Sequence, residues 1–350
     1  MNSITNNRHS YGSFKDILFY GACHYSRYDT HVPGYYEQII AQDCADSGIT
    51  SEEFAQSKIV FSFLPEGHNV EDLKPLTDLM QQTHPDRFMV LFNAVVDTDA
   101  LSYHARCIPD FLIVGNNHWT HPTNFDVDTI VPDKKFLCLM RRPSMSRAHL
   151  GEFLINHVGV DNVLMSFGSM TTVGLKGYRS FFPNHELPIL VDGIIAKHER
   201  IYDVDNPKFY SCTFNIVAES SGQTMDAHIW KSIFLTEKTW KVIMQHQLPI
   251  WYGVPGIVNQ VRQLGFDTFD DILDNHRYDV VQNESERYQQ VFALITNINQ
   301  RYSLADCQHL RNQLKPRLMA NYQRLVELSK TIRPRITEYI KEFNNKQGIP

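Results

Sequence analysis

No glycine-rich phosphate loop of a familiar type occurs in this sequence. Neither a Gly-x-Gly-x-x-Gly segment nor a Gly-x-x-x-x-Gly-Lys-Ser/Thr segment is present in the 350 residues. Such segments hold the phosphates of dinucleotides or of nucleoside triphosphates through backbone N–H groups at a helix start. Dinucleotide-dependent oxidoreductases and P-loop enzymes therefore lack their usual signal here.

Cysteine is scarce and scattered, and no Cys-x-x-Cys pair occurs. The six cysteines are Cys23, Cys44, Cys107, Cys138, Cys212 and Cys307. Several lie within apolar stretches, which indicates reduced, buried thiols and disfavours a disulfide framework. We therefore expect a cytoplasmic protein.

Long apolar runs are also missing. The longest, such as residues 59–64, fall far short of the ~20 residues that span a bilayer. The opening segment MNSITNNRHS lacks the charged start and apolar block of a signal peptide. We expect neither a membrane span nor a secretion signal.

The charge balance is mildly acidic. Lys and Arg total 33 and Asp and Glu total 39, for a net charge of -6. This disfavours a protein that binds polyanions over a broad surface, although it is compatible with a local basic cleft. Because 43% of the residues are hydrophobic and 21% are charged, the chain can bury sizeable cores.

Short apolar runs alternate with helical patterns along most of the chain. This order predicts parallel sheets with crossover helices, an α/β fold of two Rossmann-like domains. The polar segment 119–133, which contains two prolines, predicts a linker between domains at 1–118 and 134–330. In the first domain we expect strands at 17–20, 59–64, 88–96 and 111–114, and helices at 35–46 and 70–83.

The second domain repeats the alternation and ends in helices. We expect strands at 135–140, 162–167, 209–217 and 249–252, and helices at 146–158, 236–247, 258–264 and 285–299. The tail 306–344 has an almost wholly helical pattern, and we predict a break near Pro334, with a separate C-terminal helix at 331–350.

Polar side chains follow several of the predicted strands. In open parallel sheets, ligands bind beyond the carboxyl ends of the strands. In the second domain this rule selects Arg141 and Arg142, then Arg147 in the next helix, and also Glu219. Guanidinium groups beside a helix N-terminus could hold a diphosphate, although a solvated strand end with ordinary ion pairs explains the arginines equally well.

A helix start at Thr236 is a further candidate. Thr236 can cap the helix, which leaves Glu237 and Lys238 in its first turn. The Glu carboxylate could accept hydrogen bonds from sugar hydroxyls, and the Lys ammonium could neutralise phosphate. A capped surface helix with a routine Glu and Lys would give the same spacing.

The segment from residue 214 to residue 279 contains FNIVAES, FLTEKTWKVI, LPIWYGVPG and LGFDTFDDILD. In this order they resemble the donor-binding half of the GT-B glycosyltransferases, above all the inverting fucosyltransferases. The chain is also similar to sequences of tailed-phage genomes that are regarded as glycosyltransferases, which add the GF-TFDD block and a strand ending in Arg-Arg-Pro. The resemblance covers residues 135–290.

The resemblance implies a GT-B architecture whose C-terminal helix crosses back to the first domain. It implies that Glu219 and Glu237 contact the ribose or sugar of a nucleotide-sugar donor, and that Lys238 and an arginine of the Arg141/Arg142 pair bind its diphosphate. For a phage-encoded enzyme it also implies the host cytoplasm.

The chain departs from the relatives in three places. Met140 stands where an Asn usually precedes the Arg pair, and Ser144–Ser146 stand where basic residues are common. Glu219-Ser220-Ser221 replaces a Glu-Asn-Ser turn, which leaves the donor base open.

The mechanism of such a transfer follows from charge. The leaving diphosphate gains negative charge as the glycosidic bond lengthens, so fixed cations stabilise the transition state more than the ground state. An inverting transfer also needs a general base for the acceptor hydroxyl. Our candidate catalytic bases are Glu66 and Asp97, which follow predicted strands of the first domain. We expect no metal ion and no cofactor besides the nucleotide-sugar co-substrate.

Two alternatives remain open. Asp97-Thr98-Asp99 matches the DxD motif with which GT-A transferases hold a metal ion, but DxD recurs at 126–128 and 203–205, so chance accounts for it. A non-catalytic glycan- or partner-binding protein on the same scaffold is the second alternative. The acceptor stays open between a hydroxylated base in phage DNA, a glycan and other hydroxyl compounds, and the sequence does not indicate the oligomeric state.

Overall fold

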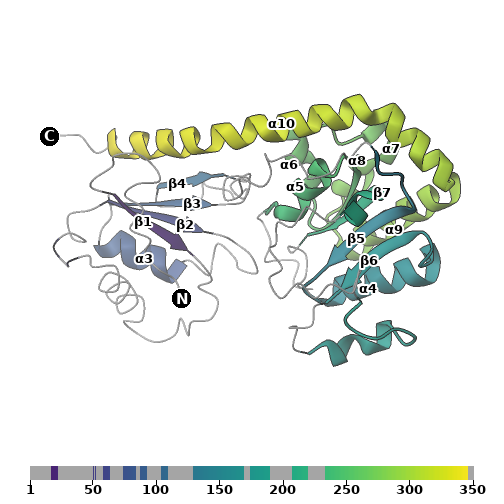
Figure 1. The fold of residues 1–350 in the computed structure, drawn as a ribbon. Coiled ribbons are helices and arrows are strands. Elements are labelled where there is room, and N and C mark those ends of the chain that lie inside the picture. Colours follow the sequence, from purple (N-terminus) through teal and green to yellow (C-terminus); the bar gives the residue numbers. More distant parts are fainter. Residues whose placement is uncertain are drawn as a thin grey trace. The chain divides into compact units, whose positions relative to one another are not determined.

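The protein is an α/β protein with two parallel sheets and a helical C-terminal region (Figure 1). The computed structural model describes residues 17–22, 50, 52, 58–63, 74–83, 87–92, 104–108, 129–168, 174–189, 207–219 and 233–345. The chain divides into two compact units. Unit 1 comprises Met1–Val114, His228–Phe234 and Ser329–Pro350, and unit 2 comprises Gly115–Ala227 and Leu235–Leu328. The domain limits and the linker at 119–133 that the sequence suggests stay predictions.

The sheet of unit 1 follows the chain order. Its strands are β1 (Ile17–Ala22), β2 (Lys58–Phe63), β3 (Phe88–Phe92) and β4 (His104–Cys107), all parallel and paired in that sequence. Helix α3 (Lys74–Thr83) lies between β2 and β3 in the chain. β3 is buried along its whole length, as its unbroken apolar run predicts.

The first three strands of unit 1 are confirmed, but β4 was not predicted. Its sequence HARC contains two polar side chains in four residues, so no apolar run marks it. The predicted helix at 35–46 and the predicted strand at 111–114 lie outside the described residues.

The sheet of unit 2 has a different strand order. Its strands are β5 (Lys134–Met140), β6 (Val163–Phe167), β7 (Cys212–Ala218) and β8 (Leu248–Tyr252), all parallel, in the order β6-β5-β7-β8. The chain goes from β5 to one side and then returns to β7 on the other side. The connections after β5 and β7 therefore part in opposite directions, which makes a topological switch point between the two strands.

Unit 2 contains the helices α4 (Met145–Phe153) with a π-helical continuation η6 (Leu154–Val158), α5 (Glu237–Met244), α6 (Ile257–Gln263), α7 (Asp270–Leu273), α8 (Asn275–Asp279) and α9 (Glu284–Arg301), with 3₁₀ turns η7 (Leu175–Phe181) and η8 (Pro207–Tyr210). The four helices predicted in unit 2 correspond to α4 with its continuation η6, α5, α6 and α9, whereas α7, α8 and the 3₁₀ turns were not predicted. Turn η8 occupies the start of the strand predicted at 209–217, so that strand begins only at Cys212. The hydroxyl and N–H of Ser211 both donate to the Lys208 carbonyl and close this turn.

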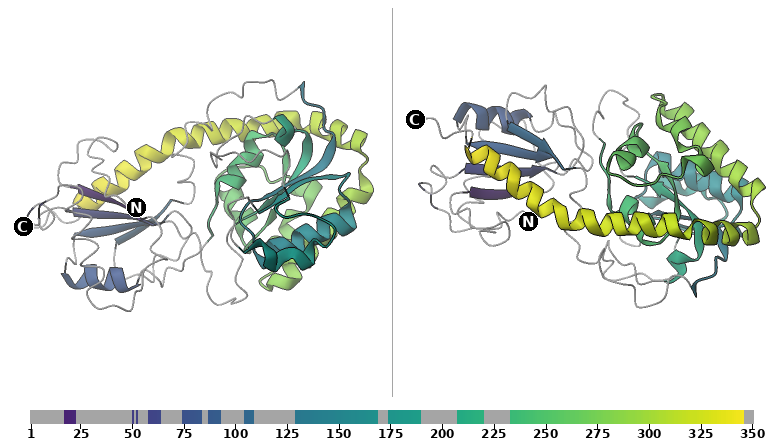
Figure 2. Two further views of the ribbon diagram at one scale, coloured as in Figure 1. Left: turned by 60° about the horizontal axis from the view of Figure 1, so that its bottom comes forward. Right: turned by 90° about the horizontal axis from the view of Figure 1, so that it is seen from above.

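Helix α10 (Leu304–Asn345) is continuous, so the predicted break near Pro334 is wrong (Figures 1 and 2). A proline removes one N–H donor from the helix ladder. A buried apolar stripe runs through this position at helical spacing and favours the uninterrupted helix. The stripe consists of Leu325, Leu328, Ile332, Ile336, Ile340 and Phe343. The boundary between the two units falls between Leu328 and Ser329 of α10.

The expected burial is confirmed for three of the four cysteines that the structure describes. Cys138, Cys212 and Cys307 are buried free thiols, and Cys107 is a half-buried one. Burial raises the pKa of Cys138 to about 12, which makes it an inert core residue. Among the described helices, none combines the length and the apolar character that crossing a membrane requires.

Candidate functional site

The described site residues predicted from the sequence gather at the carboxyl edge of the unit 2 sheet. Arg141 and Arg142 follow β5, and Glu219 follows β7. Thr236 is the N-cap of α5. Because β5 and β7 are neighbouring parallel strands, these groups meet at the switch point, the place in open α/β sheets where ligands generally bind.

Arg147 joins the ends of the two central strands. Its side chain is 1% exposed, and its Nη1 and Nη2 donate to the carbonyls of Arg142 at 2.8 Å and of Ala218 at 2.7 Å. Burial lowers the pKa of this guanidinium, and the neighbouring Glu219 carboxylate acts in the opposite direction. Arg147 thus fixes the main chain on both sides of the switch point.

Glu219 is the centre of a buried polar cluster. Its side chain is 2% exposed, and its carboxylate accepts hydrogen bonds from the Thr236 N–H at 3.1 Å, from the Thr236 hydroxyl and from the Thr239 hydroxyl at 2.7 Å. An ionised carboxylate has about four lone-pair sites, so most of its acceptor capacity is used within the protein. The resemblance implies a donor contact for Glu219, and that role stays a prediction.

The first turn of α5 carries a close charged pair. The Nζ of Lys238 lies 3.1 Å from a Glu237 carboxylate oxygen and 3.2 Å from the Thr236 hydroxyl oxygen. Burial on its own would raise the pKa of Glu237, but the charges of Lys238 and Lys241 outweigh it, so this pKa lies below its ordinary value. Both side chains keep about a fifth of their surface exposed, at 20% and 19%.

Two helix N-termini point their N–H groups toward this edge. Helix α4 starts after its N-cap Ser144, whose hydroxyl accepts from the Arg147 N–H, and α5 starts after Thr236, whose hydroxyl accepts from the Lys238 N–H. Helix N-termini carry partial positive charge. With the exposed Arg141 and Arg142 beside them, the outer layer of the site has a positive bias suited to an anion.

Three contributors to the cluster were not predicted. Thr239 donates to Glu219 and accepts from the indole N–H of Trp251 at 3.2 Å. Ser144 caps α4 two residues before the predicted start, and the Tyr252 hydroxyl donates to the Ser146 carbonyl at 3.0 Å. Only the serine had a usable sequence signal, since a serine just before a helical pattern is typical of a helix N-cap.

The remaining predicted site residues cannot be placed. Glu66, Asp97 and Asp99 lie outside the described residues, as do the other two DxD segments. Within the described ranges, no group of three or more His, Cys, Asp or Glu side chains is arranged to hold a metal ion.

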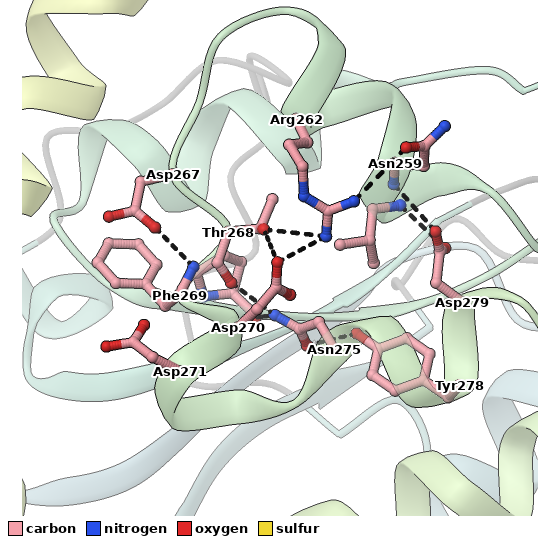
Figure 3. A network of polar contacts seen from close by, with 12 residues as sticks. Asn259, Arg262, Asp267, Thr268, Phe269, Asp270, Asp271, Asn275, Tyr278 and Asp279 are labelled. Carbon is pink, nitrogen blue, oxygen red and sulfur yellow. Dashed lines mark hydrogen bonds and ion pairs between the residues drawn. The ribbon is translucent and has the colours of Figure 1, made fainter.

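The TFDD block forms a second polar network, shown in Figure 3. Asp270 accepts from Arg262 at 2.6 Å and from the Thr268 hydroxyl at 2.8 Å. Asp279 accepts from the N–H groups of Val258 and Asn259 at the start of α6. The network connects the end of α6 to the short helices α7 and α8.

A scan of the sequence against protein-family models and a search of curated proteins found no match to this chain. The candidate site is a switch point in a parallel α/β sheet, with a buried hydrogen-bonded layer and exposed cations beside it.

Proposed function

We propose that this protein is a glycosyltransferase that binds the diphosphate of a nucleotide-sugar donor at the switch point of unit 2. The observation that carries the proposal is the meeting of Arg141, Arg142 and Lys238 with two helix N-termini at one sheet edge. A diphosphate needs several fixed donors and cations at short range, and this edge supplies both.

Within this proposal the residues have two kinds of role. Arg141, Arg142 and Lys238 would contact the diphosphate, and Glu237 would accept from a hydroxyl of the donor's ribose or sugar. Arg147, Glu219 and Thr236 would be positioning residues, because their side chains are buried and bonded to protein groups. This division moves Arg147, Glu219 and Thr236 from the donor-binding role expected from the sequence to the support of other site residues.

The proposed chemistry is an inverting, metal-independent transfer. As the bond to the sugar lengthens, charge builds on the leaving diphosphate, and the fixed cations stabilise that charge. Glu66 and Asp97 remain our candidates for the base that takes the acceptor proton. We further propose that the two sheets belong to two Rossmann-like domains of the GT-B type, with a hydroxylated DNA base or a glycan as acceptor.

The test is a mass-spectrometric screen of nucleotide sugars for slow donor hydrolysis, followed by calorimetry with the best donor. We expect Arg142→Ala and Lys238→Ala each to weaken binding about 10- to 100-fold, because each removes a charge-assisted hydrogen bond. Arg277→Ala and Lys330→Ala are matched controls, since both side chains are exposed and neither belongs to this edge.

The outcomes separate the alternatives. Donor binding without hydrolysis would indicate a binding protein on the same scaffold. Unchanged affinity in both Arg142→Ala and Lys238→Ala would overturn the assignment of the site.

A further inference from the structure

A polar cavity lies at the edge of the unit 2 sheet opposite to the switch point. It has a volume of about 120 Å³ and is lined by Ile130, Val131, Pro132, His246, Gln308, Arg311, Asn312, Lys315 and Leu318. The segment 130–132 precedes β5, and His246 precedes β8, so the cavity is at the amino edge of the parallel strands. At about 3.3 Å per residue, strands of this length separate the two edges by roughly 15–20 Å.

The polar wall of the cavity is cationic. Arg311 and Lys315 are four residues apart on α10 and therefore lie on one helix face, with Gln308 and Asn312 beside them. His246 faces them from the turn between α5 and β8. Among the lining residues that the structure describes, none is a carboxylate.

Arg311 is held in place below the surface. Its side chain is 8% exposed, and its Nη1 donates to the Tyr210 carbonyl at 2.7 Å. The backbone of His246 is left-handed, at φ 50°. Its imidazole contacts the Tyr322 ring edge-on, with ring centroids 5.6 Å apart. A cation fixed at the wall of a cavity is arranged in advance for an anion, because little side-chain entropy remains to be lost.

The volume of the cavity and its apolar wall restrict which ligands can bind there. Since a water molecule occupies about 30 Å³ of liquid, the cavity has room for roughly four waters or for one small oxyanion. A tetrahedral oxyanion can accept from an arginine, a lysine and two amides at the same time. Ile130, Val131 and Pro132 form an apolar side on which a carbon substituent could lie.

We propose that this cavity is a binding site for a phosphoryl group, either free phosphate or a phosphate monoester. The proposal does not depend on the function proposed for the switch point, because the two sites share no residue. Its ligand chemistry is set by Arg311, Lys315 and His246 together with two amide side chains.

The experiment is a calorimetric titration of the full chain with inorganic phosphate and, separately, with phenyl phosphate. We expect one site in the millimolar range or tighter, weakened about tenfold by Lys315→Ala, with a smaller loss for Asn312→Ala. Lys330→Ala is the control, because Lys330 is an exposed lysine of the same helix outside the cavity. Tighter binding of phenyl phosphate would identify an organic monoester as the ligand, and equal binding would identify the free ion; both support the site.

The Arg142→Ala variant separates this site from the switch point. Phosphate binding that survives Arg142→Ala and weakens in Lys315→Ala supports the proposal. Absence of binding, or binding that Arg142→Ala removes and Lys315→Ala leaves unchanged, would overturn it. Thermal unfolding of each variant without phosphate checks that the fold is intact, and phosphate should raise the Tm of the wild type more than that of Lys315→Ala.

Discussion

The switch-point cluster and the TFDD network of unit 2 are built from the same kinds of residues and differ in how deeply their bonded charged groups are buried. In the TFDD network, Arg317 makes paired hydrogen bonds to Asp267 and Asp271 at 2.6 to 3.0 Å. Asp270 and Asp279 are likewise engaged by protein donors (Figure 3). At the switch point, Glu219 and Arg147 form a buried layer, and the side chains of Arg141 and Arg142 are exposed beside it.

Under the proposed function, the difference separates a scaffold from a ligand site. Charged side chains that satisfy one another tie helices together and have little left for a ligand. A ligand site needs groups held in position by others, which is the relation between Lys238 and the Glu219–Thr236 cluster. Three substitutions sharpen or break this comparison.

The largest effect is expected at the buried layer. Glu219→Ala would remove the carboxylate that most strongly favours the Arg147 charge and would leave two threonine hydroxyls without their acceptor. Removal of one partner from a buried charged cluster costs about 3–5 kcal/mol. We expect that loss in the free energy of unfolding measured with urea, whereas Arg142→Ala should stay within about 0.5 kcal/mol of wild type. A Glu219→Ala protein as stable as wild type would break the comparison.

An intermediate effect is expected at Asp279. Its two carboxylate oxygens accept from Val258 N–H at 3.0 Å and Asn259 N–H at 2.9 Å. In Asp279→Asn, one N–H would face an amide NH₂ group instead of an acceptor, at a cost of about 1–3 kcal/mol.

The pH dependence of this cost has a definite sign. Burial raises the pKa of Asp279 above its ordinary 3.8, despite the hydrogen bonds to its carboxylate. The wild type therefore gains stability relative to Asp279→Asn as the pH falls from the folded-state pKa to 3.8. Urea unfolding of both proteins across this pH range measures the difference between their free energies of unfolding. A difference that becomes smaller as the pH falls would contradict the argument.

The smallest effect is expected at Arg317. Arg317→Lys keeps the charge but loses the paired geometry to two carboxylates, and the side chain is 36% exposed, so we expect a loss of about 1 kcal/mol. Hydrogen bonding from Arg317 is the main cause that lowers the pKa of Asp271 below 3.8. The contribution is therefore present above pH 3.8 and disappears as the pH falls through the lowered value.

Urea unfolding at pH 7 and again in acid measures this contribution, and high salt should reduce it. A loss that persists unchanged in acid would show that Arg317 acts through packing alone, for example through its contact with the Phe269 ring.

The sequence predicted at which strand ends the candidate site lies. It did not predict the hydrogen bonds among the residues of the site. Arg141, Arg142 and Glu219 follow apolar runs that end abruptly, which places them at strand ends. The sequence did not indicate that Glu219 would be enclosed by Thr236 and Thr239. That enclosure brings together groups 17 and 20 residues apart, and no local pattern encodes such a distance.

The prediction at Pro334 was wrong for a related reason. Local propensity favours a break at a proline, whereas the buried stripe that includes Ile332 and Ile336 favours a continuous helix. The free energy gained by burying these side chains depends on the segments that cover them. Here that gain exceeds the cost of losing one helix hydrogen bond.

The amino-acid order alone determined the alternation of strands and helices and the polar residues at their ends, because the period of apolar side chains follows from local backbone geometry. The tertiary structure decided the rest. Strand order set the switch point between β5 and β7, and packing determined which polar groups became buried and which stayed exposed. The physical reason is that desolvation and hydrogen bonding depend on neighbours in space, and those neighbours exist only once the sheet has assembled.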